Sequence, residues 1–222
     1  MRLLFALLLS LAPLRAGTIM GTVRAEGKTE AAGAAKGGKY DSRKFKFVAR
    51  VDYEELQDFV VFIDQVPTNT PAPPPKPLQV ITQQDAVFRP HVLPVVKGTT
   101  VEWPNKDDIF HNVFSMSDAK PFDLGLYRDP EVKKVTFDKA GRVDVFCSIH
   151  SKMNCVVLVL ENPWFAAADP KGHYRIEGVP AGKYRLKAWH KRVPAQTLEI
   201  VVPEQGEVRA DFVLGIKNLP KY

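Results

Sequence analysis

Apolar and polar residues alternate along most of this 222-residue chain, and no stretch has the three-to-four-residue apolar spacing of an amphipathic helix. Alternation with a period of two is typical of strands that bury one face. The 18 prolines and 14 glycines supply the turns that many short strands require. Since 45% of the residues are hydrophobic and 25% are charged, the composition excludes a disordered tail and a multi-span membrane protein. We therefore expect an all-β fold.

The first sixteen residues read as an export signal. Met1 and Arg2 precede an apolar run over residues 3–14, whereas a membrane-spanning helix needs about 20 apolar residues. The small pair Ala16 and Gly17 then offers a cleavage site. We expect cleavage after Ala16 and an exported mature chain, and the alternative is a retained N-terminal anchor helix.

A proline-rich segment divides the remaining chain. Residues 67–77 hold six prolines in eleven positions, which predicts an extended, stiff linker. We expect strands before the linker at 17–24, 44–52 and 59–63. After the linker, residues 78–160 form a second unit with strands expected at 85–88, 92–96, 100–103, 131–137, 141–147 and 154–160. Residues 161–222 are expected to add four more strands.

Positive charge concentrates near the N-terminus, where residues 24–52 carry eight Lys or Arg side chains and four acidic ones. One interpretation is a solvated loop followed by an edge strand that lysines protect from aggregation. The other is a docking segment for an acidic partner. Nucleic acid fits poorly as a partner, because export removes the opportunity and the net charge of the whole chain is only +6.

Residues with metal-binding chemistry concentrate in two stretches of the 78–160 unit. Cys147, His150 and Met153 follow one another at intervals of three, on a loop that can curl around one point. The thiol shares the parity of the apolar residues on the preceding strand, so it points inward. A distant His111, expected on a separate loop, would complete the set. One thiolate, two imidazoles and a thioether suit copper, since soft sulfur stabilises Cu(I) and imidazole binds both oxidation states.

Other readings of these residues remain open at this stage. Cys147 and Cys155 could form a disulfide in an exported protein, although Cys155 lies in an apolar strand and reads better as a packing thiol. A Cys-x2-His half-site could bind zinc, but it lacks a second cysteine or a further histidine. A binuclear copper centre needs two cysteines closer together than these. His91 reads as structural, and His173 and His190 have no soft ligand near them in the sequence.

The pattern resembles the type 1 copper site of the cupredoxins, most closely the amicyanin and plastocyanin group, over residues 88–160. This resemblance implies a Greek-key β-sandwich that binds one copper through His111, Cys147, His150 and Met153. It also implies that Asn112 supports the ligands from behind and ties the two ligand loops together. His150 would be the ligand through which electrons enter and leave.

The sequences on either side resemble a carboxypeptidase regulatory-like (transthyretin-type) β-sandwich. Its second half matches residues 167–186, and its first half matches the glycine-bearing strand at 17–23 and the apolar strand at 59–63. We therefore expect a cupredoxin domain at 78–160 inserted into one sandwich made of residues 17–66 and 161–222. The alternative is a separate C-terminal domain, with the N-terminal strands packed on the cupredoxin unit.

The combination is similar to exported methylamine utilization proteins. The resemblance implies a periplasmic electron carrier, not an enzyme, that serves redox partners such as a periplasmic dehydrogenase or a c-type cytochrome. We expect an apolar patch around His150 that includes Met116 or Phe122, and neither nucleic-acid binding nor stable membrane insertion. Two rival functions are copper sequestration or delivery, and a metal-free role in protein interaction.

Overall fold

The structure is a computed structural model that describes residues 16–27, 53, 55–65 and 78–215. Nearly all of the expected signal segment, the strand at 44–52, most of the basic segment and the linker at 67–77 lie outside these residues. Within the described ranges every regular element is a strand, which confirms the all-β prediction. No helix with the length and hydrophobicity to cross a membrane is found in that part of the chain.

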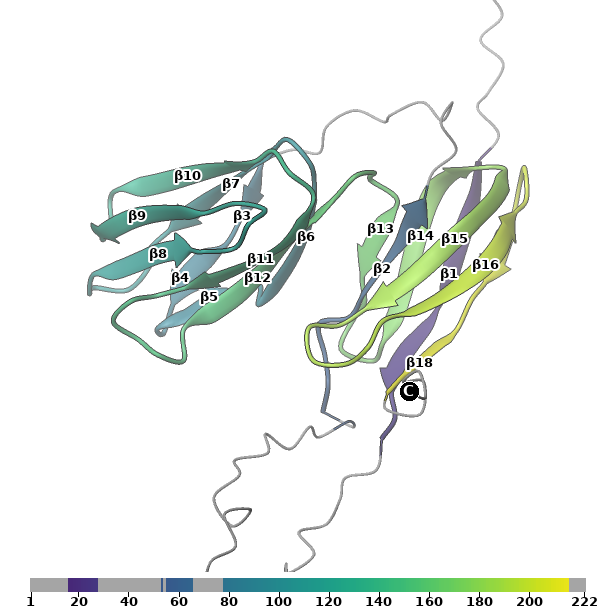
Figure 1. Ribbon diagram of the computed structural model, residues 1–222, viewed down its shortest axis with the longest axis horizontal. Helices are drawn as coiled ribbons and strands as arrows, with labels where there is room; N and C mark the ends of the chain where they lie inside the picture. Colours follow the sequence, from purple (N-terminus) through teal and green to yellow (C-terminus); the bar gives the residue numbers. More distant parts are fainter. Residues whose placement is uncertain (1–15, 28–52, 54, 66–77, 216–222) are drawn as a thin grey trace, which may run out of the picture.

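The strands form two β-sandwiches that lie side by side (Figure 1). The flanking sandwich consists of β1 (Ala16–Ala25), β2 (Val60–Gln65), β13 (Phe165–Ala167), β14 (His173–Pro180), β15 (Gly182–Trp189), β16 (Gln196–Val202), β17 (Glu207–Arg209) and β18 (Phe212–Leu214). The middle sandwich consists of β3 (Gln79–Val80), β4 (Thr82–Gln84), β5 (Val87–Arg89), β6 (Val92–Val96), β7 (Thr99–Pro104), β8 (His111–Ser115), β9 (Phe122–Tyr127), β10 (Val132–Phe137), β11 (Gly141–Phe146) and β12 (Asn154–Leu160).

The flanking sandwich joins strands from both ends of the described chain. One sheet has the order β14-β1-β17, with β18 also on β1, and the other has the order β13-β2-β15-β16. β1 runs antiparallel to β14 and parallel to β17 and β18. The two sheets share a core to which Ile19, Ile63, Ile176, Leu186 and Phe212 contribute. The chain therefore leaves this sandwich after β2, builds the middle sandwich and returns at β13.

The middle sandwich packs a three-stranded sheet, β10-β7-β3, against a five-stranded sheet, β6-β12-β11-β8-β9. Its core is centred on large buried side chains, among them Phe88, Trp103, Tyr127 and Phe137. The short hairpin of β4 and β5 adds Phe88 to this core.

Three sequence expectations about elements require correction. Asp85 and Ala86 were expected to begin a strand, but both have positive φ, 58° and 52°, and form the turn between β4 and β5. His111 was expected on a loop, but it is the first residue of β8. Residues 161–222 hold six described strands where four were expected, because β13, β17 and β18 are only three residues long. Such short elements carry too few residues for alternation to be recognised.

The two sandwiches meet through a cluster of apolar side chains, which we call the junction cluster. It consists of Val60, Val92, Val156, Leu158, Leu160 and Phe165, with Phe62, Val96 and Trp189 packed at its edge. β12 supplies three of these residues from one face, while Cys155, Val157 and Val159 on its other face belong to the middle core. Burial on both faces explains why residues 154–160 form an almost continuous apolar run, as parallel or central strands do.

The close approach of β1 to the C-terminal segment can be tested at Gly21. A Cβ there would lie 1.9 Å from the carbonyl oxygen of Ala210, so Gly21→Ala forces the two backbones apart. We expect a loss of about 1–3 kcal/mol in the free energy of unfolding, measured by urea denaturation of the full chain. The control Arg24→Ala, on the exposed side of β1, should change it by less than about 0.5 kcal/mol. Equal effects of the two substitutions would contradict this packing.

Candidate metal centre

The side chains of His111, Cys147 and His150 meet at one end of the middle sandwich. Nδ1 of His111 lies 3.1 Å from Nδ1 of His150, and Sγ of Cys147 lies 3.8 Å from the same His150 nitrogen. One ligand atom from each of the three residues lies within 4.8 Å of the other two. Since metal–imidazole and metal–thiolate bonds are about 2.0–2.3 Å long, one ion can reach all three atoms.

Two strand ends place these donors. His111 begins β8 and is completely buried, and Cys147 follows β11 with its thiol on the core side. The intervening loop to β12 closes on itself, since the Cys147 N–H donates to the Met153 carbonyl at 3.1 Å. The Met153 N–H in turn donates to the His150 carbonyl at 3.0 Å. Met153, the fourth residue expected at the site, is buried, and its backbone is hydrogen-bonded to the backbones of Cys147 and His150.

Asp107 sets the orientation of the His111 ring. Its Oδ2 atom lies 2.7 Å from Nε2 of His111. A carboxylate only accepts hydrogen bonds, so Nε2 carries the proton and donates it. The lone pair of His111 Nδ1 is thereby directed at His150 and Cys147, which is the tautomer that a metal ligand needs. Sequence reasoning did not assign Asp107, although an acid four residues before the histidine was visible in the sequence.

The loop before His111 is held rigidly around Asp107. The Asp107 carboxylate accepts hydrogen bonds from the N–H groups of Asp85 and Ala86 at 2.7 and 2.9 Å. Burial alone would raise the pKa of this carboxyl, but the hydrogen bonds from Ala86, His111 and Asp85 lower it below its usual value. The buried Asn105 side chain accepts from the Asp107 N–H and donates to the Ile109 carbonyl. The β4–β5 turn therefore supports a candidate ligand more than twenty residues away in the sequence.

Asn112 links β8 to the loop that follows Cys147. Its Oδ1 atom accepts from the Ser148 N–H at 3.2 Å, and its Nδ2 atom donates to Asp123 at 2.7 Å. The amide therefore bridges the two segments that carry the candidate ligands, with β9 as a third attachment. This is the placement that the cupredoxin resemblance implies for a residue behind the ligands.

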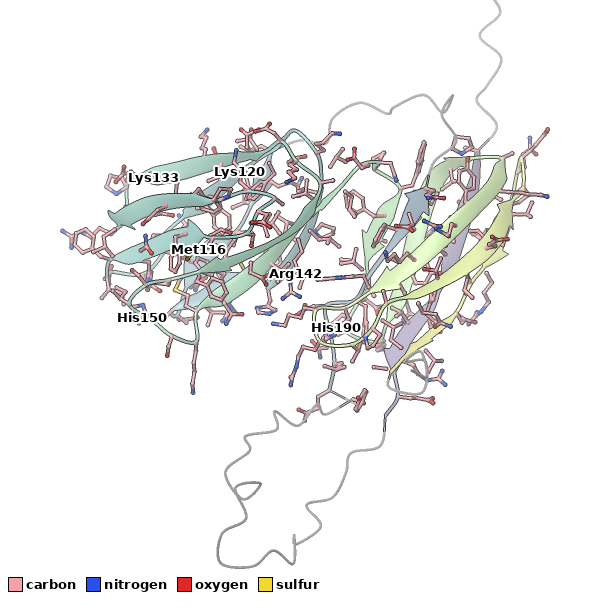
Figure 2. All side chains as sticks on the ribbon, in the orientation of Figure 1. Met116, Lys120, Lys133, Arg142, His150 and His190 are labelled. Atoms are coloured by element: carbon pink, nitrogen blue, oxygen red, sulfur yellow. The ribbon has the colours of Figure 1, made fainter. Side chains whose placement is uncertain are left out.

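The site is buried on one side and open on the other. His111 is inaccessible, whereas His150 is half-buried. The chain neighbours of the two histidines, Ile109, Phe110 and Ile149, are each about half exposed. Figure 2 shows His150 at the end of the middle sandwich that lies away from the flanking sandwich.

Met116 and Phe122 were the side chains expected in this apolar patch, and the structure shows that they differ in exposure. Met116 is 83% exposed, at the end of the β8 strand that His111 begins. Phe122 is half-buried and packs against the middle core, with its ring 6.3 Å from that of Trp103. Phe122 is therefore a core-edge residue.

Both cysteines are free, so the alternative disulfide is not formed. Cys155 faces the middle core from β12, and burial raises the pKa of its thiol well above the usual value. A thiol in that state packs as an apolar group and has little reactivity. Cys147 remains the one cysteine whose sulfur lies beside imidazole nitrogens.

The donor set fits copper. Three electron-rich atoms in close contact repel one another unless a proton or a cation is shared among them, and a soft thiolate with two imidazoles favours Cu(I) and Cu(II) over harder ions. Zinc fits less well, because the fourth residue expected at the site is a methionine and thioethers are not among the usual zinc ligands.

Comparisons with known proteins agree with this chemistry. Residues 78–160 match the family of copper binding proteins, plastocyanin/azurin family. No curated protein matches the chain. The match spans β3 to β12 and contains every candidate ligand. Together the family match and the donor set identify copper as the cofactor of this domain.

Several solved structures are similar to part of the chain. A reduced Cu(I) form of an amicyanin variant is 24% identical over 38% of this chain and 84% of its own, with a TM-score of 0.36. The copper-containing nitrite reductase of Thermus scotoductus SA-01 is 28% identical over 44% of this chain and 25% of its own, with a TM-score of 0.37. A purple cupredoxin from Nitrosopumilus maritimus is 24% identical over 37% of this chain and 98% of its own, with a TM-score of 0.33.

The support that Asp107 gives to His111 leads to a prediction for metal affinity. Asp107→Asn replaces the acceptor-only carboxylate, so the His111 tautomer and orientation are no longer fixed. We expect copper affinity to fall about 10–100-fold in a competition titration with a chelator. The matched control is Asp108→Asn, next in the chain and exposed, which should leave the affinity unchanged. An Asp107→Asn variant with full affinity would remove Asp107 from this role.

Proposed function

We propose that the chain is a periplasmic type 1 copper protein that carries single electrons between redox partners and is not an enzyme. The observation that carries the proposal is the convergence of His111 Nδ1, His150 Nδ1 and Cys147 Sγ, with one imidazole buried and the other reaching the surface. Bound copper supplies the one-electron redox couple. His111, Cys147, His150 and Met153 are the ligands in this proposal.

The protein's part is to hold the donors still while the charge of the metal changes. The loop from Cys147 to Met153 is closed by two backbone hydrogen bonds and tied to β8 by Asn112. His111 is fixed by Asp107. Rigid donors favour fast electron transfer, because little structure has to rearrange between the two oxidation states. With copper bound, the thiolate of Cys147 would provide strong coupling to the metal, and the thioether of Met153 would tune its potential.

Partners would dock on the apolar surface around His150. Ile109, Phe110 and Ile149 give this surface a small hydrophobic area, which suits the brief encounters of electron-transfer partners. A periplasmic dehydrogenase as donor and a c-type cytochrome as acceptor fit this role, as in methylamine utilization. The solvent-accessible edge of the half-buried His150 would be the point of electron exchange.

The remaining chain would serve export and assembly. In this proposal residues 1–16 are a signal peptide, residues 17–66 and 161–222 form a carboxypeptidase regulatory-like sandwich, and residues 67–77 link it to the cupredoxin domain at 78–160. The pairing of β1 with β14, and of β2 with β13 and β15, supports one discontinuous sandwich.

The role of Met153 as a ligand can be tested by its effect on the reduction potential. Met153→Gln replaces a soft thioether with a harder amide oxygen, which favours Cu(II). We expect a lower reduction potential, measured by spectroelectrochemistry, with copper retained. Met116→Gln is the control, because that methionine is exposed and outside the ligand set. If both variants keep the parent potential, Met153 is not a ligand of the copper.

Electron self-exchange, measured by NMR line broadening, distinguishes a carrier from a copper store. Fast exchange is expected for the parent protein. Ile149→Glu places like charges face to face when two molecules meet, and should slow the exchange by about tenfold or more at low salt. Val201→Glu, at an exposed position of the flanking sandwich, is the control. Slow exchange in the parent, together with ready loss of copper to a chelator, would favour copper delivery instead.

A further inference from the structure

One turn of the flanking sandwich contacts a strand that carries the Cys147–Met153 loop, β11, and reaches the other, β12, through His91. Lys191, the second residue after β15, contacts Nε2 of His91 through its Nζ atom. The Lys191 carbonyl accepts a hydrogen bond from Nη1 of Arg142 at 3.3 Å. Arg142 lies on β11, which leads into Cys147. Figure 2 shows Arg142 and the neighbouring His190 where the two sandwiches face each other.

His91 connects Lys191 to the other strand of the loop. Its carbonyl accepts a hydrogen bond from the Val156 N–H at 2.9 Å. Val156 is the third residue after Met153. The start of β12 is therefore bonded to the residue of the middle sandwich that Lys191 contacts through its side chain, close to the point where the loop ends.

Electrostatics favour a neutral His91 ring that accepts a hydrogen bond from the Lys191 ammonium group. Burial and the positive charge of Lys191 both lower the pKa of His91, and Asp58 opposes them. On the β11 side, Arg142 is also held by Asp144, at 3.0 Å from Nε and 2.7 Å from Nη2. Lys191 thus faces a hydrogen-bond acceptor on one side and offers its carbonyl to a cation on the other.

The turn that presents Lys191 is itself fixed. His190 is buried, its Nδ1 atom accepts from the Arg192 N–H at 3.1 Å, and its ring lies 5.0 Å from that of Phe59. Burial lowers the pKa of His190 to about 4, so the ring remains a neutral acceptor at neutral pH. The contacts of Lys191 are therefore made from a rigid support.

We infer that Lys191 and His91 are positioning residues through which the flanking sandwich holds the Cys147–Met153 loop in its ligand-binding shape. The loop itself is exposed at Ser148, Ile149, Ser151 and Lys152. Lys191 of the other sandwich accepts a hydrogen bond from β11 directly, and it contacts His91, whose carbonyl is hydrogen-bonded to β12. The consequence for copper rests on the proposed function, whereas the effect on the loop belongs to the metal-free chain as well.

The test is amide hydrogen exchange of the full-length, metal-free chain, followed by NMR. Lys191→Met keeps the length of the side chain and removes the ammonium. Exchange at the Cys147 and Met153 amides, whose hydrogen bonds close the loop, should accelerate about fivefold. The Val23 amide, bonded to the Gly172 carbonyl in the flanking sandwich, should not change. Lys183→Met, at an exposed position of β15, is the matched control.

Two further variants separate positioning from general stability. Lys191→Arg keeps a cationic donor and should keep the exchange slow. His91→Gln should reproduce the faster exchange at Cys147 and Met153 without altering the backbone contact to Val156. In copper-loaded protein, Lys191→Met should shift the Cu(II) electron paramagnetic resonance spectrum and speed copper loss to a chelator by a similar factor, again with rescue by Lys191→Arg.

Unchanged exchange at Cys147 and Met153 in Lys191→Met would overturn the inference and leave the proposed function intact. Equal acceleration at Val23 would also overturn it, because the effect would then be a loss of global stability. Failure of the parent chain to bind copper would instead refute the proposed function, while the loop exchange would still decide the positioning role.

Discussion

The burial of β12 on both faces is the constraint on which the rest of the structure depends. One face of this strand completes the core of the middle sandwich, and the other forms the junction cluster with β2 and β13. Because side chains alternate along a strand, a slip of one residue would exchange the two faces and move Met153 relative to Cys147. The same strand that joins the sandwiches therefore fixes the end of the candidate ligand loop.

Sequence reasoning identified the candidate ligands because the information is local. Three of them follow one another at intervals of three, and strand parity alone directs the Cys147 thiol inward. Asp107 and Asn105 were not assigned, because their contacts depend on how a turn at residues 85–86 folds beside the loop at 105–111. That juxtaposition is set by tertiary packing, and spacing along the chain does not encode it.

The continuous apolar runs at 59–63 and 154–160 were correctly recognised as strands. The sequence did not predict that these two strands meet in the junction cluster. The hydrophobic effect has no direction, so an apolar strand face can be covered by any other apolar surface. Contacts such as Lys191 with His91 join residues a hundred positions apart. These polar contacts select one arrangement of the two sandwiches where hydrophobic burial alone permits several.

Coordination of copper by the Cys147 thiolate is the central claim of this account. The most direct test is a titration of the reduced, metal-free full chain with Cu(II), followed by visible absorption, in the parent and in Cys147→Ser. A type 1 site predicts an intense blue thiolate-to-copper band that saturates at one equivalent, disappears on reduction and is absent from Cys147→Ser. A parent protein that stays colourless with copper bound, or a band that survives in Cys147→Ser, would contradict it.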